Sequence, residues 1–393
     1  MLYIMPSCSD SSPGILKKNI QRVAAIEKQG VEVKGLFFSK DEKENKNINT
    51  SIEKIAYSNN YPLNKTPYLW RFTPAYQQKK HIDAINNVVN KYLNNKTKPF
   101  IYLRYPGASR FALRMLKNWQ RKGVQFCIEM NGKEEAFYLR QLNENPQDIF
   151  AKHYLNCEQK YAQAMMKLAD LVVGVSHEIA GFYGANTPTY ILSNGFDVNS
   201  VKVRQGMLTS EEPINFALIS GSPNYWNGAD RYINAFKTYD GTRKVTLHLV
   251  GSFKPAYLKR LSGNIIQHGM LNKEQLDQLM QNMHVGLGSC SLFRVGLSEG
   301  CVLKIREYLS RGLPVVLGYQ DTDLNFGKNL DFVHNISANE SSVNVQEVIN
   351  WTVELYKKYN TLHQDIRNFA KSTFSYENKM RAFVNYLKEH QLI

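Results

Sequence analysis

Short apolar runs alternate with amphipathic stretches along the first half of the chain. Residues 2–5 are apolar, apolar side chains recur at helical spacing from Ile15 to Ile26, and residues 31–38 are apolar again after Gly30. Strand, helix and strand in this order predict a parallel sheet with helices on its faces. The same alternation returns further along the chain. It predicts strands at 100–105, 124–130, 171–175 and 190–192, and a helix at 109–121.

A second series of the same kind follows a polar stretch at 199–212. It predicts strands at 214–219, 244–250, 264–267, 284–287 and 314–317, and helices at 230–238, 273–281 and 304–310. Residues 40–98 are rich in Asn and Lys, and we expect them to form loops with one or two helices. The tail from 345 to 387 is expected to be helical.

The two series predict an α/β chain with two successive Rossmann-like, doubly wound domains. In such sheets ligands bind at the carboxyl ends of the strands, so the two domains should face a central cleft. We place the first domain at 1–200 and the second at 201–370. A C-terminal helix within 371–393 is expected to cross back to the first domain.

Composition places the chain among globular proteins, since 43% of its 393 residues are hydrophobic and 21% are charged. No apolar run reaches the roughly 18–20 residues that span a bilayer. The segment before Pro13 lacks the basic lead and long apolar block of a cleaved leader. The five cysteines are scattered without CxxC or Cys/His ligand spacing, which argues against a disulfide framework and a zinc module. We therefore expect a cytoplasmic protein with no metal.

The net charge is +15, and most of the excess lies in residues 1–200, which contain 27 Lys and Arg against 17 Asp and Glu. A basic surface attracts nucleic acid, anionic lipid headgroups or phosphorylated ligands, and charge alone does not choose among them. The helix at 109–121 carries basic residues opposite an apolar side. That apolar side is expected to pack on the sheet, while the basic side can lie near an anionic membrane.

The densest group of candidate residues lies between Gly296 and Val316. Glu299 and Glu307 are eight residues apart, so a helix that begins near Cys301 would leave Glu299 in the loop before it and Glu307 inside it. The free amide groups and the dipole at a helix start suit a phosphate, to which Lys304 can add a charge. Glu307 can accept hydrogen bonds from a ribose, and Glu299 from sugar hydroxyls.

This group resembles the donor-site signature of GT-B glycosyltransferases of family 4, in which Glu-x7-Glu is followed by a helix and Gly-x-Pro-Val-Val. Further segments occur in the order of that family. They are residues 169–176, 193–197, 225–231 and 267–280. The resemblance covers about residues 1–370 and is densest in the second half of the chain.

The resemblance implies retaining transfer of a sugar from a nucleotide-diphosphate sugar, UDP- or GDP-linked, without a required metal or other cofactor. The acceptor would be a saccharide or a polyprenyl-diphosphate-linked sugar bound by the first domain, at the inner face of a bacterial cell membrane. The products would be surface polysaccharides such as capsule or lipopolysaccharide. In that family the second Glu binds the ribose, a role that falls to Glu307, and the first contacts the donor sugar, a role that falls to Glu299. Backbone amides that hold sugar and phosphate would be those of Gly300, Cys301, Val302 and Leu303, and Gly14 would approach the diphosphate from the first domain.

The sequence departs from the family at three places. Asn227 stands where the family often has a diphosphate-binding Lys, so Arg231 or Lys304 is expected to supply that charge. The loop after the first strand has a single glycine. No histidine marks the contact with the acceptor, and Glu129 or Asn131 is expected to make it instead.

Two other functions stay open. A sugar-nucleotide epimerase on the same fold would act on the donor with no acceptor present. A nucleic-acid-binding protein would fit the charge and the 12% of aromatic residues, but no recognised binding motif is present, and the transferase interpretation expects no nucleic acid partner. Asp321-Thr-Asp323 matches the Asp-x-Asp pattern of a metal–diphosphate site, yet it follows the strand at 314–317 and is interpreted as a loop or cap.

Overall fold

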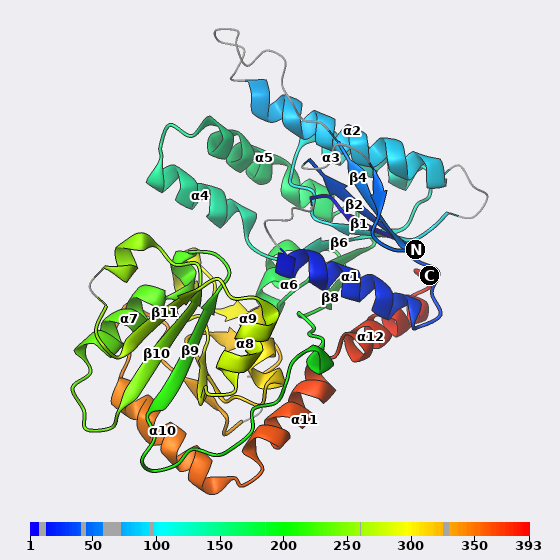
Figure 1. Cartoon of the computed structure of the whole chain (residues 1–393). Coiled ribbons are helices and arrows are strands. Elements are labelled where there is room, and N and C mark those ends of the chain that lie inside the picture. The colour runs from blue at the N-terminus through cyan, green and yellow to red at the C-terminus, as the bar shows by residue number, and fades with distance from the viewer. Residues whose placement is uncertain are drawn as a thin grey trace. The chain divides into compact units, whose positions relative to one another are not determined.

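The computed structural model describes residues 1–7, 13–40, 45–57, 72–93, 98–184, 186–259, 261–324 and 330–393. The chain divides into two compact units (Figure 1). The first unit comprises Met1–Leu192 together with Lys379–Ile393, and the second comprises Ser193–Asn378. Each unit contains a mainly parallel sheet with helices, so the prediction of two Rossmann-like α/β domains is confirmed.

The described residues of the first unit form an eight-stranded sheet in the order β3-β4-β2-β1-β5-β6-β7-β8. All neighbouring strands are parallel except β3 and β4. The strands are β1 (Leu2–Met5), β2 (Lys34–Ser39), β3 (Lys46–Asn47), β4 (Ile52–Ala56), β5 (Ile101–Arg104), β6 (Phe126–Met130), β7 (Leu171–Gly174) and β8 (Thr189–Ile191). Strands β1, β6 and β7 are buried along their whole length, which explains why they read as continuous apolar runs.

The helices of the first unit are α1 (Pro13–Glu27), α2 (Thr73–Leu93), α3 (Arg110–Arg121), α4 (Glu134–Glu144), α5 (Ile149–Met166) and α6 (His177–Tyr183). Helices α2, α3 and α5 contact one another on one face of the sheet (Figure 1). Helix α3 begins where Ser109 accepts a hydrogen bond from the amide of Ala112, and it buries Met115, Leu116 and Trp119. The apolar side of this helix therefore packs inside the unit, and its basic side stays on the surface.

One sequence-based expectation for the first unit is wrong. Residues 40–98 contain the sheet strand β4 as well as helix α2, whereas the polar composition predicted only loops and helices. Ile52, Lys54 and Ile55 of β4 are buried, so this strand buries a lysine together with its apolar residues. The charged run at 40–46 and the loop at 8–14 lie partly outside the described residues, in 41–44 and 8–12.

The described residues of the second unit form a six-stranded sheet in the order β11-β10-β9-β12-β14-β16, in which all paired strands are parallel. Its strands are β9 (Ile214–Ser220), β10 (Val245–Gly251), β11 (Ile265–Gly269), β12 (Val285–Leu287), β14 (Val315–Leu317) and β16 (Val333–Asn335). A separate two-stranded sheet joins β13 (Glu299–Gly300) to β15 (Gln320–Asp321). The helices are α7 (Ala229–Thr238), α8 (Lys273–Met280), α9 (Leu303–Ser310), α10 (Val345–Lys358) and α11 (Leu362–Phe374).

The tail is helical, as predicted, and consists of three helices because the chain breaks after Lys358 and again at Ser375. The last of them, α12 (Tyr376–Glu389), packs in the first unit from Lys379 onward, where Phe383 contacts Tyr102 and Tyr190. The chain leaves the first unit after Leu192, at the edge of the sheet, and returns to it at Lys379. The expected limits of the second domain were 201 and 370.

The hydrogen bonds around residue 193 explain this boundary. Ser193 Oγ donates to Asp323 at 2.7 Å, and the amide of Asn194 donates to Cys301 Sγ at 2.8 Å. Ser193 and Asn194 thus belong to the second unit, although the sequence analysis assigned them to the first domain and placed the junction at 199–212.

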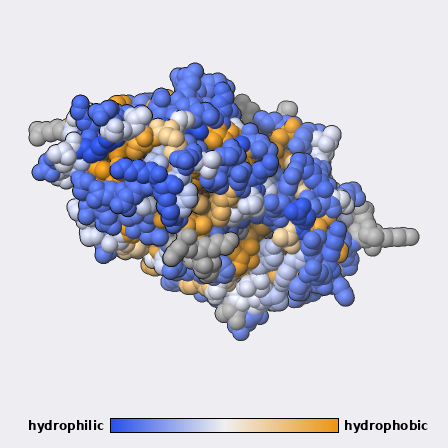
Figure 2. All heavy atoms as spheres, turned by 90° about the horizontal axis from the view of Figure 1, so that it is seen from below, coloured by the Kyte–Doolittle hydropathy of each residue, from blue (hydrophilic) through white to orange (hydrophobic). Residues whose placement is uncertain are grey.

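Hydrophilic side chains cover most of the face drawn in Figure 2, with apolar residues visible between them. Among the described helices, none combines the length and the apolar character that a membrane crossing needs.

Candidate functional site

The candidate residues of the second unit surround the start of helix α9, which follows strand β13 (Figure 1). Strand β12 ends at Leu287 and leads into a loop of Ser289, Cys290 and Ser291, all buried. A side chain at Gly288 would meet Ile305 of α9 and the carbonyl of Val316, each within 3 Å. Close packing therefore requires this glycine, and it brings α9 against the carboxyl ends of the central strands.

Glu307 lies on α9 with its carboxylate held on one side. Arg311, one turn further on, donates from Nη2 and Nε to Oε1 of Glu307 at 2.8 and 3.2 Å. Arg311 is itself held by Asp277 at 2.7 Å. Within the described part of the chain Oε2 of Glu307 has no hydrogen-bond partner, and the side chain is 20% exposed. One carboxylate oxygen is thus positioned and open to a hydroxyl donor.

Glu299 lies on β13, where it is paired in register with Gln320 of β15 and is only 5% exposed. The structure therefore places Glu299 just before α9, on a short strand rather than in the loop that the sequence predicts.

The first turn of α9 has free backbone donors. Val302 is its N-cap residue, and its side chain makes no capping hydrogen bond. An uncapped helix start leaves amide groups without partners, and such a start favours negative charge. Leu303 is the first helical residue, while Gly300 and Cys301 are tied in place through their carbonyls, which accept from Thr322 and Asn194. The backbone from Gly300 to Leu303 is thus rigid and ends in open donors.

Lys304 supplies a positive charge beside this helix start. Its Nζ is buried, and no described residue accepts a hydrogen bond from it. Burial lowers the pKa of Lys304 to about 8, and the thiol of Cys290 acts weakly in the opposite direction. A buried ammonium without a partner is costly, since charges inside proteins are normally paired. Among the described residues, no negatively charged group therefore pairs with the ammonium of Lys304.

Arg231 does not have the role that the sequence suggested. Its guanidinium donates to the backbone carbonyls of Cys290, Ser337 and Ser341, and the side chain is 7% exposed. Both terminal nitrogens of Arg231 are occupied in holding loops together, and its Nε is buried without a hydrogen-bond partner among the described residues.

Asn227 is likewise a bridge between loops. Its amide nitrogen donates to Ser220 Oγ at 3.2 Å, and its amide oxygen accepts from Ser289 Oγ at 3.0 Å. The residue that replaces the family's lysine thus links the ends of β9 and β12, and it adds no charge to the site.

The Asp321-Thr-Asp323 segment has a structural role among the described residues. Both carboxylates bind the buried guanidinium of Arg306 on α9, Asp321 through both oxygens and Asp323 at 2.6 Å. Carboxylates engaged in this way hold β15 against α9. This pairing explains the Asp-x-Asp pattern without a metal ion.

In the first unit Gly14 is the second residue of α1 and is exposed. A side chain there would meet nothing within 4 Å, so packing does not require a glycine at this position. The rest of its loop, residues 8–12, lies outside the described part of the chain.

Glu129, expected on the acceptor side, is instead fully buried in β6. Arg22 Nη1 lies 2.5 Å from its Oε1, and Lys18 and Arg104 lie 3.7 and 3.4 Å from its carboxylate. Burial acts to raise the pKa of Glu129, but these three cations outweigh it and hold the pKa well below its usual range. The expectation of a direct contact between Glu129 and a ligand is therefore wrong. Asn131 is exposed, and its Oδ1 accepts from Lys18 at 3.0 Å.

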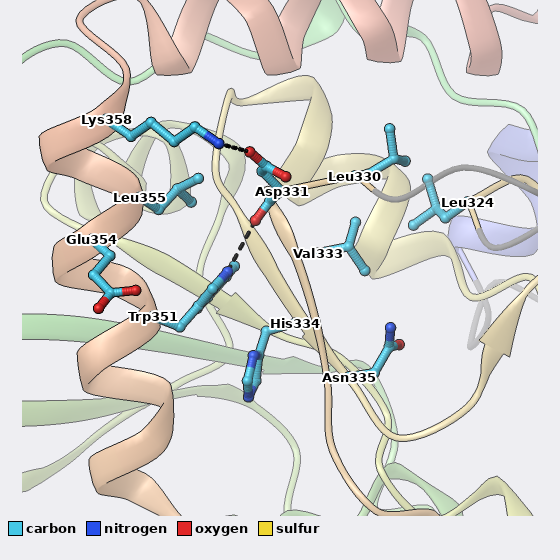
Figure 3. Close-up of a pocket in the computed structure, with 10 residues that line it drawn as sticks. All are labelled: Leu324, Leu330, Asp331, Val333, His334, Asn335, Trp351, Glu354, Leu355 and Lys358. Carbon is cyan, nitrogen blue, oxygen red and sulfur yellow. Dashed lines mark hydrogen bonds and ion pairs between the residues drawn. The ribbon is translucent and has the colours of Figure 1, made fainter.

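The described cavity of about 500 Å³ in the second unit lies elsewhere, between β16 and α10 (Figure 3). Its lining includes Asp331, whose carboxylate accepts from Lys358 and whose carbonyl accepts from Trp351. None of the residues predicted to bind a donor lines this cavity. The candidate site is thus defined by hydrogen-bond donors and acceptors that have no partner among the described residues, and not by the cavity between β16 and α10.

Sequence comparison finds no matching family model and no matching curated protein. Solved structures are similar along the whole chain. The apo form of the lipopolysaccharide outer core galactosyltransferase WaaB has a TM-score of 0.64 and 14% identity, over 99% of this chain and 100% of that one. Sucrose-phosphate synthase from Thermosynechococcus elongatus has a TM-score of 0.63 and 12% identity, over 99% and 98%. WaaG, a glycosyltransferase involved in lipopolysaccharide biosynthesis, has a TM-score of 0.60 and 14% identity, over 97% and 98%.

At these identities the likeness concerns the fold. It agrees with the division of the chain into two α/β units, each with its own parallel sheet. The chain therefore has the two-domain GT-B fold that its sequence predicts.

Proposed function

We propose that this chain is a retaining glycosyltransferase of the family 4 type, which transfers a sugar from a nucleotide-diphosphate sugar to a saccharide or lipid-linked acceptor. The observation that carries the proposal is the buried, unpartnered Nζ of Lys304 beside the uncapped start of α9. A diphosphate would supply the missing negative charge and accept from the open amides. The GT-B fold and the Glu-x7-Glu spacing support this assignment.

In the proposed reaction the bond between the anomeric carbon and the diphosphate oxygen breaks. The acceptor oxygen forms the new bond to that carbon on the same face, and its proton passes to the leaving diphosphate. Negative charge grows on the diphosphate as the bond breaks, so Lys304 and the amides after Gly300 bind the transition state better than the ground state. Oε2 of Glu307 accepts from the ribose, and Glu299 accepts from hydroxyls of the donor sugar.

The first test is thermal unfolding of the full chain with UDP, GDP, ADP, CMP and dTDP, each with and without EDTA. A ligand at about 100 times its Kd adds about 2.7 kcal/mol to stability, so the correct nucleotide should raise the midpoint by several degrees. Indifference to EDTA would support a metal-independent donor site. If none of the nucleotides raises the midpoint, the donor-site assignment is wrong, and a salt-dependent shift with RNA or DNA would favour the nucleic-acid alternative.

Glu307→Ala tests the residue assignment. The variant should bind the stabilising nucleotide at least tenfold more weakly, because the ribose loses an acceptor that Arg311 holds in place. Glu354→Ala, which removes an exposed carboxylate from helix α10 of the same unit, should bind it like the parent. Product analysis then separates transfer from epimerisation, since an epimerase would convert the donor sugar with no acceptor present.

We further propose that the enzyme acts in surface polysaccharide assembly at the inner face of the cell membrane. The support is the exposed basic side of α3, which carries Arg110, Arg114, Lys117 and Arg121. Basic residues near an anionic surface contribute about 1 kcal/mol each to attraction. Co-sedimentation should be strong with phosphatidylglycerol vesicles and absent with phosphatidylcholine vesicles, and equal recovery with both would contradict this location.

A further inference from the structure

A group of cations lies at the carboxyl edge of the sheet in the first unit. Arg104 ends strand β5, Glu129 lies near the end of the neighbouring strand β6, and Lys18 and Arg22 reach them from helix α1. Three cations thus face one carboxylate, at distances of 2.5 to 3.7 Å. Arg22 is the nearest of the three cations, and both Arg22 and Glu129 are fully buried.

Arg104 differs from Arg22 in what its guanidinium contacts. Arg22 is held by Glu129, by the hydroxyl of Tyr102 and by the carbonyl of Leu192. Arg104 has only an ion pair between its Nε and Oε2 of Glu129 at 3.4 Å, and it makes no hydrogen bond with any described residue. Its side chain is 16% exposed. The two terminal nitrogens of Arg104 are therefore fixed near the surface with their donors unused.

The neighbouring carboxyl groups do not remove the excess charge. Glu129 is shared among three cations. Glu134, at the start of α4, is a carboxyl group whose pKa the charge of Arg104 acts to lower, but burial together with Glu158 raises the pKa of Glu134 to about 7. Glu134 is thus only partly ionised at neutral pH. Buried or half-buried charge without full compensation is costly, which favours an anion at this edge.

The position of the group matches where open parallel sheets bind ligands, outside the carboxyl ends of their strands. A planar guanidinium with two free amino groups suits the oxygens of a phosphoryl group, and a nearby lysine adds a point charge. Lys18 is directed here by Asn131, which is exposed beside it.

We propose that Arg104, with Lys18 beside it, binds a phosphoryl group of the acceptor. Resting on the proposed transferase function, this assigns the acceptor to phosphate-bearing compounds, either a soluble sugar phosphate or a sugar carried on a lipid phosphate. Glu129 is a positioning residue, which holds the cations together and does not touch the ligand.

The experiment measures binding of inorganic phosphate to the full-length chain by isothermal titration, in the background of Lys304→Met. That substitution removes the charge proposed for the donor diphosphate, so the titration reports on the first unit whether or not the donor site is assigned correctly. Arg104→Gln should weaken phosphate binding at least tenfold. The matched control is Arg381→Gln, which removes an exposed arginine from α12 in the same unit and should leave phosphate binding unchanged.

A structural role for Arg104 predicts a different result. If Arg104 only supported the fold, Arg104→Gln would lower the unfolding midpoint without phosphate, and the conservative Arg104→Lys would restore it. A ligand-binding role predicts an unchanged midpoint without phosphate and a lost increase in midpoint with phosphate. Equal phosphate affinity in the parent background and Arg104→Gln would overturn the proposal.

Two further probes separate the sources of the phosphoryl group. Glucose 1-phosphate represents a soluble sugar phosphate, and phosphatidylcholine vesicles containing a polyprenyl phosphate represent a lipid-linked one. Binding that depends on Arg104 in either arm supports the proposal and names the source. Binding of neither probe, or binding of both that is indifferent to Arg104→Gln, contradicts it.

Discussion

The sheet edges of the two units both carry buried positive charge, but they hold it differently. In the first unit Arg22 and Arg104 are gathered around Glu129, so the cations are already positioned by a carboxylate of the chain. In the second unit Lys304 has no hydrogen-bond partner among the described residues, and the helix start beside it has no side-chain cap.

This difference teaches that a buried charge has to be judged by its partners. Arg306 lies two residues from Lys304 on the same helix and is also buried, yet it binds Asp321 and Asp323 and is thereby part of the fold. Lys304 has no such partner, and Arg104 has only a long ion pair. The charges that remain unmatched are those for which we propose ligands.

The largest effect is expected from removing the carboxylate that organises the first unit's edge. Glu129→Gln leaves three cations facing a neutral amide, and breaking a buried ion pair in this way costs about 3–5 kcal/mol. Urea unfolding measures the loss. The control Glu144→Gln breaks an exposed pair with Arg140 and should cost under about 1 kcal/mol. Similar losses for both variants would mean that the cations need no carboxylate.

An opposite change of stability is expected at the second unit's edge. Lys304→Met removes an unpaired buried charge, so without ligand the variant should be more stable than the parent by up to about 3 kcal/mol at neutral pH. The same variant should bind the stabilising nucleotide more weakly. Lys357→Met, at an exposed position of α10, is the control.

The pH dependence of stability identifies the charge responsible. Lys304 loses its proton near pH 8 in the folded chain and near its ordinary value of 10.5 in the unfolded chain. Between these values the unfolded chain binds more protons, so the stability of the parent rises with pH. The difference between parent and Lys304→Met should therefore shrink over this interval in urea unfolding. A constant difference would show that the pKa of Lys304 is the same in the folded and the unfolded chain.

The smallest effect concerns Glu134 and the anion proposed at Arg104. Sulfate is a suitable probe because its charge does not change near neutral pH. As the pH falls through about 7, Glu134 takes up a proton and stops repelling the anion, while Glu129 stays ionised. Sulfate binding by the parent should tighten a few-fold, as measured by titration calorimetry. Glu134→Gln should bind sulfate equally at all these pH values, and a parent-like pH profile in this variant would exclude Glu134 as the cause.

Much of the fold could be predicted because buried parallel strands are continuous apolar runs. In the second unit, strands β9, β10, β11, β12 and β14 begin and end within two residues of their predicted limits, whereas the short strand β13 was not predicted. Strand β4 was missed because Glu53 and Lys54 interrupt its apolar residues, and only its place beside β2 in the sheet accounts for its burial. The helical character of the tail was predicted, but its division into three helices was not, because three amphipathic helices in succession show the same period as a single one.

The candidate site was predictable only where local spacing sets geometry. The interval between Glu299 and Glu307 follows from a strand end and one helix, and the structure has both in place. The roles of Arg231 and Glu129 could not be predicted, because their partners are more than 50 residues away in the sequence. One feature of the sequence indicated that Arg22 is buried with a partner: it is a basic residue among the apolar positions of α1.

The sequence by itself determined the alternation of strands and helices, the two-unit α/β class and the spacing between Glu299 before α9 and Glu307 on it. These properties depend on the spacing of apolar residues over a few turns of the chain and on the backbone preferences of neighbouring residues. The tertiary structure decided which charges are satisfied, because the partners of Arg104 and Arg231 come from segments that only folding brings together. Folding likewise buries Lys304 without a hydrogen-bond partner among the described residues. Desolvation then makes each unmatched charge costly, and the sequence cannot show which charges remain unmatched.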